Sequence, residues 1–252
     1  MRAFLDLHCH TRASFDCLAA PEAVVRAAAA RGLTHLAITD HDRIDGALAG
    51  REAAARLAAA GGPELEVLVG EEIRTADGDL IGVFLERPVP PGLNAAETAA
   101  AIREQGGLVG LPHPFDRFRG TLGRRAGTDA AAGGMAAIAA EVDWIEAWNA
   151  RLVGRGNERA AELALEHGRP GVAVSDAHSV IEVGVAYSVV DGDPSTPAGL
   201  RAALGSVSLV TGRASYAVRA ITPVAKLVQR ARGNRRVAAD PAPASPARAP
   251  RS

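Results

Sequence analysis

Short apolar runs rich in β-branched residues alternate along the chain with longer, Ala-rich segments. The short runs have the length of buried strands, and the longer segments have apolar residues at helical spacing. We therefore expect strands at residues 3–7, 35–39, 65–70, 80–85, 108–111, 144–148 and 171–174. The helices between them are expected at residues 21–31, 45–60, 95–105, 129–141 and 156–167.

Several of these helices carry end signals. Pro21 suits a first helical turn, where the amide hydrogen that proline lacks would have no partner within the helix. Asn94 followed by Glu97 is typical of a capping box. Glycines follow the last residues of three helices, as expected of C-terminal caps; they are Gly32, Gly106 and Gly168.

The alternation of strands and helices predicts a mostly parallel sheet with right-handed crossovers. About seven such units in about 200 residues favour a barrel over an open sheet, so we predict an α/β, TIM-like barrel. The sequence has no GxGxxG or GxxxxGK[ST] motif, which removes the main support for dinucleotide-binding and P-loop folds. We expect one barrel domain over residues 1–231 and a disordered tail, rich in Ala, Pro and Arg, over residues 232–252.

Composition narrows the class of protein. The chain has 252 residues, 48% of them hydrophobic, and a net charge of -1, which gives no global reason to expect nucleic-acid binding. No uncharged apolar run of 18 residues occurs, and Asp6 interrupts the segment that a signal peptide would need. Cys9 and Cys17 do not make a disulfide framework. We therefore expect a cytoplasmic, bacterial-type enzyme with free thiols.

The polar residues that could carry chemistry gather at or just beyond the ends of the predicted strands. In a parallel α/β barrel the carboxyl ends of the strands meet at one rim, where active sites lie. Residues more than a hundred positions apart are therefore expected to converge there. The candidates are His8, His10, Asp16, His41, Glu72, His113, Asn149, Asp176 and His178.

Local spacing supports this prediction. Residues i and i+2 of an extended strand share a face, so His8 and His10 can reach one metal ion while Cys9 points away. Asp176 and His178 have the same spacing. Imidazole and carboxylate ligands suit Zn2+, Mn2+ or iron, and the two oxygens of a glutamate such as Glu72 could bridge two ions.

Other polar residues have simpler explanations. His35 opens its strand at the end away from the predicted site, and His167 lies in the last turn of a helix, where partial positive charge interacts with the helix dipole. Glu71 is expected to face away from the side chain of Glu72. The two aspartates that flank His41 could orient it through hydrogen bonds.

At these residues the chain resembles the PHP family (polymerase and histidinol phosphatase domains). The matching segments occur in the family's order and span residues 6 to about 190. They are Asp6-Leu7-His8-Cys9-His10-Thr11, with Ser14 and Asp16 after them, then Ile38-Thr39-Asp40-His41-Asp42, Gly70-Glu71-Glu72-Ile73, Pro112-His113-Pro114 and Ser175-Asp176-Ala177-His178.

The resemblance implies a distorted (β/α)7 barrel that binds two or three divalent metal ions (Mn2+, Zn2+ or Fe2+) and hydrolyses phosphoesters. By position, His8, His10 and Asp176 would hold one ion. Glu72 would bridge it to a second ion, which His113 also binds. A third ion would be held by Asp16, His41 and His178. The residues expected to serve catalysis as well are Glu72, Asp176 and His178.

The chain departs from the family pattern in two places. Many relatives have a histidine in the segment that here reads Thr75-Ala76-Asp77-Gly78-Asp79-Leu80, and relatives with a full trinuclear site have one near the strand end where this chain has Asn149. Asp79 and Asn149 are therefore the candidate ligands for the second ion. The alternative is a dinuclear centre.

The expected reaction is hydrolysis of a phosphomonoester or small phosphodiester by a water whose pKa the metals lower to about 7. Arginines could clamp the phosphate; the candidates are Arg117, Arg119, Arg124, Arg125 and Arg151. The expected partner is a small phosphorylated substrate, with a nucleotide or oligonucleotide among the options. Three alternatives remain: a 3′–5′ exonuclease or oligonucleotide phosphatase, a histidinol phosphatase, and a non-catalytic metal-binding regulatory module.

Overall fold

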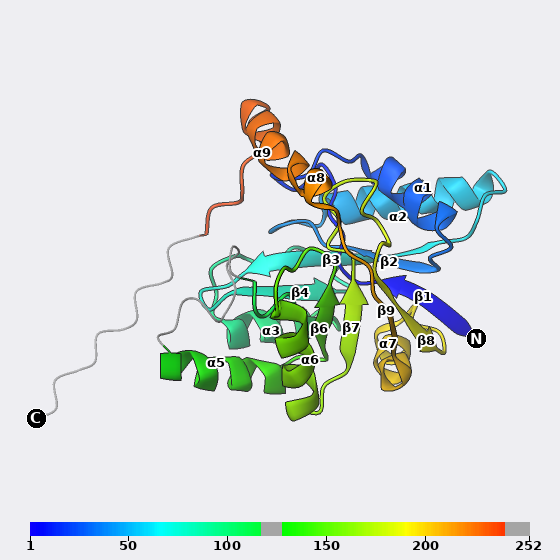
Figure 1. Ribbon diagram of the computed structural model, residues 1–252. Coiled ribbons are helices and arrows are strands. Elements are labelled where there is room, and N and C mark those ends of the chain that lie inside the picture. Colours follow the sequence, from blue (N-terminus) through cyan, green and yellow to red (C-terminus); the bar gives the residue numbers. More distant parts are fainter. Residues whose placement is uncertain (117–127, 240–252) are drawn as a thin grey trace, which may run out of the picture.

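In residues 1–116 and 128–239, which the computed structural model describes, nine strands form one sheet that curls into a nearly closed barrel (Figure 1). Their order is β7-β6-β5-β4-β3-β2-β1-β8-β9. Every predicted strand is present, and the α/β, TIM-like barrel is confirmed. The strands are β1 (Arg2–Asp6), β2 (His35–Ile38), β3 (Glu66–Arg74), β4 (Asp79–Val83), β5 (Leu108–Leu111), β6 (Trp144–Asn149), β7 (Gly171–Val174), β8 (Tyr187–Asp191) and β9 (Ser208–Val210).

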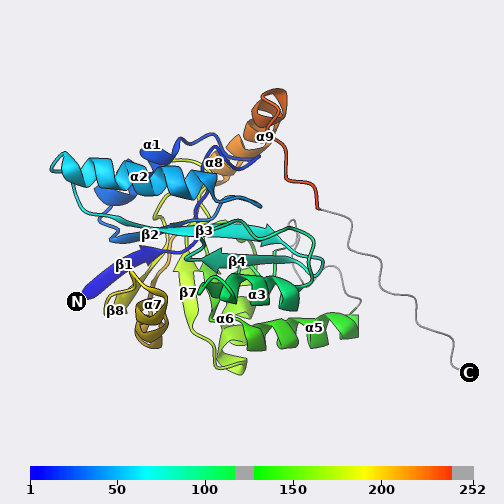
Figure 2. The same ribbon diagram turned by 180° about the vertical axis from the view of Figure 1, so that it is seen from behind.

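Helices cover the outside of the barrel. Figures 1 and 2 show α1 and α2 against one side of the sheet and α3, α5 and α6 against the opposite side. The described helices are α1 (Pro21–Ala30), α2 (Asp45–Ala59), α3 (Ala95–Arg103), α5 (Thr128–Glu141), α6 (Gly156–Glu166), α7 (Pro197–Ala203), the 3-10 helix η1 (Leu204–Ser206), α8 (Tyr216–Arg219) and α9 (Ile221–Ala231).

The predicted helix ends are confirmed. Pro21 occupies the first turn of α1. The side chain of Asn94 accepts the Glu97 amide at 2.8 Å, and the Glu97 carboxylate accepts the Asn94 amide at 3.0 Å, which completes the capping box of α3. The three predicted cap glycines have φ of 76°, 77° and 59°, a region in which glycine has no steric penalty; they are Gly32, Gly106 and Gly168.

The barrel closes between β1 and β7 at the rim where these strands end. The Asp176 amide donates to the His8 carbonyl, and the His10 amide donates to the Ala177 carbonyl, both at 2.9 Å. Farther from the rim β8 pairs with β1 in antiparallel fashion. The Ser188 hydroxyl of β8 then reaches the main chain of β7. The closure therefore brings the ends of the first and the seventh strand directly together.

The sheet is less parallel than the alternation predicts. Strand β4 runs antiparallel to both of its neighbours, β3 and β5, because a tight turn at residues 75–78 replaces a crossover helix. The Thr75 hydroxyl, which holds this turn, accepts the amides of Asp77 and Gly78 at 3.0 Å. The reversal places the start of β4, and therefore Asp79, at the same rim as the ends of the parallel strands.

Two apolar layers hold the barrel. Alternate residues of each strand point inward or toward the helices: Leu36 and Ile38 pack in the layer under the helices, whereas Ala37 belongs to the barrel interior. Trp144, the largest fully buried side chain among the described residues, lies in that interior. Gly110 on the next strand makes room for it, since a Cβ there would lie 2.3 Å from the Trp144 ring.

The chain returns to the rim after the barrel is complete, through residues 221–239, which we call the C-terminal arm. In Figure 1 the arrowheads of β6 and β7 point toward α8 and α9. Residues 232–239 differ from the disordered tail that was expected, because Asn234 and Arg236 form hydrogen bonds at the rim. Residues 240–252 lie outside the described residues. Among the described helices, none is long and apolar enough to cross a membrane.

Candidate metal centre

The first group of predicted ligands meets at the closure of the barrel. The Nε2 atoms of His8 and His10 lie 3.0 Å apart, and both side chains are fully buried. Glu72, from β3, places Oε2 at 3.3 and 3.4 Å from these nitrogens. Asp176, after β7, places Oδ1 at 3.6 and 3.5 Å from them. Cys9 points away into the layer under the helices, as its spacing predicts.

These distances are those of ligands around a shared cation. Donor atoms about 2.1 Å from one ion lie about 3.0 to 3.4 Å from one another in octahedral or tetrahedral geometry. The two imidazole nitrogens face each other, and the two carboxylate oxygens lie beside them. The lone pairs of these four atoms are therefore directed at one point. The residues present therefore fit a divalent metal ion at this position.

Neighbouring side chains orient the two histidines for this role. The Nδ1 of His8 lies 2.6 Å from Oε1 of Glu146, so the neutral form of His8, which a metal ion would bind, carries its hydrogen on Nδ1 and its lone pair on Nε2. The Ser14 hydroxyl donates to Asp40 at 2.8 Å, so it accepts from Nδ1 of His10 at 3.1 Å. Both rings are thus held in the form in which Nε2 can bind a metal.

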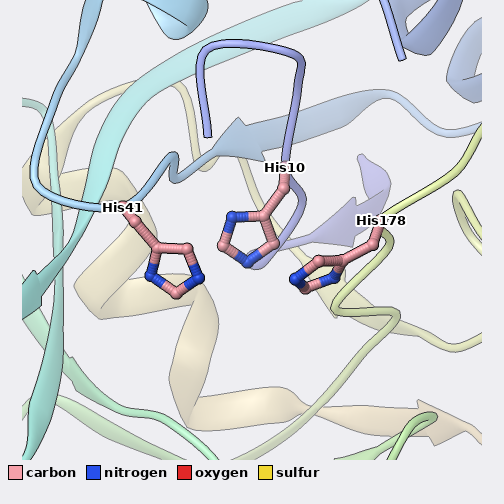
Figure 3. A group of neighbouring side chains, drawn as sticks. All are labelled: His10, His41 and His178. Atoms are coloured by element: carbon pink, nitrogen blue, oxygen red, sulfur yellow. The ribbon is translucent and has the colours of Figure 1, made fainter. Parts of the chain in front are cut away.

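A second group lies beside the first. The rings of His10, His41 and His178 come from the ends of β1, β2 and β7 and lie side by side in Figure 3. The Nε2 atoms of His41 and His178 are both 3.4 Å from Oδ2 of Asp16. The Nδ1 of His178 donates to the Asp176 carbonyl at 2.9 Å, which leaves its Nε2 directed toward Asp16.

Glu72 faces both groups and a further histidine. Its Oε2 lies 3.1 Å from Nδ1 of His41, and its Oε1 lies 3.0 Å from Nε2 of His113. Its two oxygens therefore point to different sets of ligands, as a bridging carboxylate requires. The structure thus brings together all eight residues proposed as ligands.

Charge within the ion-free centre is set by burial and by opposite charges. Burial alone would lower the pKa of His8, but the carboxylates of Glu146, Asp176 and Glu72 raise it well above its usual value. Burial opposes ionisation of Glu72, yet the charges of His41 and His8 lower its pKa well below the usual range. In the ion-free centre, protons on His8 and His41 therefore balance the negative charge of the carboxylates, as a divalent cation would when bound.

Two histidines are kept neutral. Burial lowers the pKa of His10 to about 4, and it does the same for His178. Burial opposes ionisation of Asp16, but the positive charge and the hydrogen bond of His41 overcome this effect and lower the pKa of Asp16 well below the usual range. Neutral imidazole and ionised carboxylate are the forms that bind metal ions.

The backbone is strained at the same rim. Asp42, His113 and Asp176 have φ of 56°, 25° and 51°, values that residues other than glycine rarely adopt. Such strain costs free energy and persists where surrounding structure imposes it, often at functional sites. Two of these three residues belong to the proposed ligand set.

The comparisons with known proteins agree with this geometry. The profile of the PHP domain matches residues 6–121, and the PHP-associated profile matches residues 154–207. An uncharacterised protein of Methanocaldococcus jannaschii is 35% identical over 130 residues, which cover 48% of this chain and 72% of that protein. The chain belongs to the PHP domain family.

Solved structures share the PHP fold at low sequence identity. A two-domain Bacteroides vulgatus protein that contains a predicted PHP-like metal-dependent phosphoesterase superposes with a TM-score of 0.67 at 18% identity, over 84% of this chain and 65% of that one. The lesion-specific endonuclease EndoQ of Pyrococcus furiosus superposes with a TM-score of 0.57 at 17% identity, over 83% of this chain and 58% of that one. This chain therefore spans less than two thirds of either structure.

Asn149 and Asp79, the candidate ligands for a second ion in this PHP domain, are placed differently. The Asn149 amide group donates to Asp176 at 3.1 Å and to Glu146 at 2.9 Å, while its oxygen accepts the Arg151 amide. Asn149 therefore positions Asp176 and does not direct its oxygen at the centre. Asp79 is buried at the rim and pairs with Arg236 at 3.2 Å.

Of the arginines considered for a phosphate clamp, only Arg151 lies within the described residues. Its guanidinium donates to Glu182 and, at 2.8 Å, to Thr222 on α9. The other oxygen of Glu182 accepts the His178 amide at 3.1 Å. Arg151 thereby supports the loop that carries His178. The other four candidates lie outside the described residues; they are Arg117, Arg119, Arg124 and Arg125.

The simpler explanations for other polar residues are confirmed in part. His35 is buried at the opposite end of β2, 3.0 Å from the Ser195 hydroxyl, and His167 caps α6. Glu71 faces away from the centre as expected, but it is buried and accepts the Val89 amide at 2.8 Å.

The aspartates beside His41 act less directly than expected. Asp40 accepts both the amide and the hydroxyl of Thr11 and holds Ser14, whose hydroxyl in turn accepts the His41 amide at 3.1 Å. Asp42 instead accepts the Arg74 amide at 2.8 Å. Asp40 therefore orients His41 through Ser14.

Glu146 is the functional residue that sequence reasoning missed. It lies inside the apolar run of β6, is fully buried, and joins His8 to the His113 amide, which its Oε2 accepts at 2.9 Å. A charged residue inside a buried strand is costly unless it is paired. A glutamate next to Trp144 and Ile145, which predict a core strand, is therefore the feature of the sequence that could have identified this residue.

Proposed function

We propose that this PHP protein is a metal-dependent phosphoesterase that hydrolyses a phosphomonoester or a small phosphodiester. The observation that carries the proposal is the meeting of two imidazole nitrogens, 3.0 Å apart, with oxygens of Glu72 and Asp176. Glu72 is the proposed bridge between ions. The proposed ligands are His8, His10, Asp16, His41, Glu72, His113, Asp176 and His178.

The divalent ions, when bound, would lower the pKa of a coordinated water and neutralise phosphate oxygens as charge builds. The chain's own residues hold the ligands in place: Glu146 aligns His8, Ser14 aligns His10 and Asn149 aligns Asp176. The burial of these side chains excludes bulk water, so electrostatic interactions within the site are strong.

No side-chain nucleophile is required by this proposal. Both thiols, Cys9 and Cys17, are buried, and that of Cys17 donates to the His178 carbonyl at 3.2 Å. Burial raises the pKa of Cys17, so the reactive thiolate form is disfavoured. Metal-activated water is left as the attacking group.

The test combines metal analysis with a panel of phosphate esters. The purified protein should contain two or three divalent ions per chain and hydrolyse p-nitrophenyl phosphate when Mn2+, Zn2+ or Fe2+ is supplied. Glu72→Gln should lower metal content and reduce kcat/KM by more than about 100-fold. Glu71→Gln is the matched control, because this adjacent buried carboxylate faces away from the centre.

Two results would contradict the proposal. Full metal content and activity in Glu72→Gln would mean that the carboxylate is not a ligand. Metal-loaded wild-type protein that turned over no ester or nucleotide in the panel would instead support a non-catalytic metal-binding module.

Hydrolysis of oligonucleotides is a second candidate, supported by the charge of the C-terminal arm. The chain has no acidic residue between Asp193 and Asp240, and the arm carries five cations; they are Lys226, Arg230, Arg232, Arg235 and Arg236. One of the structural neighbours is an endonuclease. Activity on an oligonucleotide should then fall steeply with salt concentration, whereas activity on a small monoester should not.

A further inference from the structure

A basic pocket lies between the C-terminal arm and the loop that follows β1. Its volume is about 280 Å³, just below the range of about 300 to 1,000 Å³ typical of ligand pockets. It therefore has room for part of a small molecule. Its walls are Phe15, Lys226, Arg230, Asn234, Arg235 and Arg236.

This pocket borders the metal centre through a single aromatic ring. The ring of Phe15 lies 5.0 Å from that of His41, and Phe15 immediately precedes Asp16. Two cations of the arm lie over the same ring, with Nζ of Lys226 at 5.4 Å and Cζ of Arg236 at 5.7 Å from its centroid. A substrate bound at the centre can therefore extend past Phe15 into the pocket.

The contacts that anchor the arm at the rim involve only one of the cations that line the pocket. Gln229 donates to the carbonyls of Arg12, Ser14 and Cys17 at 2.7 to 2.9 Å. Arg236 pairs with Asp42 at 3.0 Å and with Asp79 at 3.2 Å. These contacts suffice to fix the arm at the rim.

The remaining cations have no such role. Lys226, Arg230 and Arg235 are exposed, and within residues 1–116 and 128–239 their side chains make no hydrogen bond or ion pair. No acidic residue lines the pocket. Gathering like charges around one concave surface is unfavourable unless an anion occupies it.

We propose that the C-terminal arm forms a subsite for a second anionic group, so that the preferred substrate is a phosphate ester that also carries another phosphate or carboxylate. This inference rests on the proposed phosphoesterase function, since the first phosphate lies at the metal centre. The carboxylate-rich centre requires its metal ions before it can accept an anion, whereas the arm supplies fixed positive charge. The residues of the arm lie beyond both family matches, which end at residues 121 and 207.

The experiment measures binding without turnover. Metal-free, full-length protein, in which only the arm can hold an anion, is titrated calorimetrically with fructose and with fructose 6-phosphate, which differ by one phosphate. Wild-type protein should bind fructose 6-phosphate about tenfold more tightly than fructose, a difference of about 1.4 kcal/mol. The variant Lys226→Ala/Arg230→Ala/Arg235→Ala should lose this preference. Arg232→Ala, which removes a charge from the same arm outside the pocket, should keep it.

Several outcomes would overturn the inference. They are equal affinity of wild-type protein for both sugars, an undiminished preference in the triple variant, and an equal loss in Arg232→Ala. The substituted side chains are exposed, and urea unfolding of each variant verifies that it is folded. A protein that shows the preference but hydrolyses no ester contradicts only the proposed function, and an active protein without the preference contradicts only this inference.

Discussion

Replacement of Glu146 by glutamine should weaken metal binding although Glu146 is not itself a ligand. Its Oε1 accepts from Nδ1 of His8 at 2.6 Å, and its Oε2 accepts from the His113 amide and from Asn149, both at 2.9 Å. Glutamine has the same shape but only one acceptor. One side of this network must therefore lose its partner.

Both orientations of the new amide are unfavourable. If its oxygen stays with His8, its NH2 group faces two donors, the His113 amide and Asn149. If the amide turns over, its NH2 group faces Nδ1 of His8, and the hydrogen of His8 moves to Nε2, the atom that would bind the metal. Loss of such a partner typically lowers metal affinity 10- to 100-fold, or about 1.4 to 2.7 kcal/mol.

The assay is competition for Zn2+ between the protein and a chromophoric chelator. Asp143→Asn is the matched control, because this carboxylate lies just before β6 at the opposite end of the strand, where it accepts the Val109 amide at 2.8 Å. We expect weaker affinity in Glu146→Gln alone. Wild-type affinity in that variant would refute the reasoning that Glu146 holds His8 in its ligand form.

Three further predictions concern stability. Burial raises the pKa of Glu71 from 4.5 to about 8, so between these pH values the native state retains a proton that the unfolded chain releases. The stability of wild-type protein relative to Glu71→Gln should therefore fall by roughly 2 to 5 kcal/mol as pH rises from 4.5 to 8. Urea unfolding of both proteins at both pH values measures this change, and a pH-independent difference would contradict the prediction. Gln229→Ala should lower the free energy of unfolding by about 1 to 3 kcal/mol. It should also speed amide hydrogen exchange of residues 12–17, because the Gln229 side chain donates to three carbonyls of this loop. Unchanged exchange would mean that α9 does not restrain the loop. Gly46→Ala should destabilise by about 1 to 3 kcal/mol, because its Cβ would lie 1.9 Å from Oδ2 of Asp40; a thermal midpoint equal to that of wild-type protein would argue against this close approach.

Much of the fold and most of the centre followed from local pattern. Hydrophobic runs located all seven predicted strands, and Asn94 with Glu97 located a helix start, because these signals depend on neighbours along the chain. The i and i+2 spacing of His8 and His10 predicted a shared target, and their Nε2 atoms do face each other.

Other features depend on residues that are distant in the sequence. The pattern at residues 80–85 predicts a strand but not its direction, and only the turn before Asp79 reversed β4. In the sequence, Glu146 is an isolated charge within a core strand. Its role depends on the fold, because the barrel brings it into contact with His8, which is 138 positions away. The tail was expected to be disordered from residue 232, since its apolar content is low, but Asn234 and Arg236 find partners at the rim.

The sequence by itself therefore determined which elements form and which side chains could bind a metal, because periodicity and chemical type are local properties. The tertiary structure alone decided which ligand atoms share a point, which imidazole nitrogen carries its hydrogen, and which cations border the centre. These depend on how strands close into a barrel and where the chain returns to its rim, and such contacts form only when distant segments pack together.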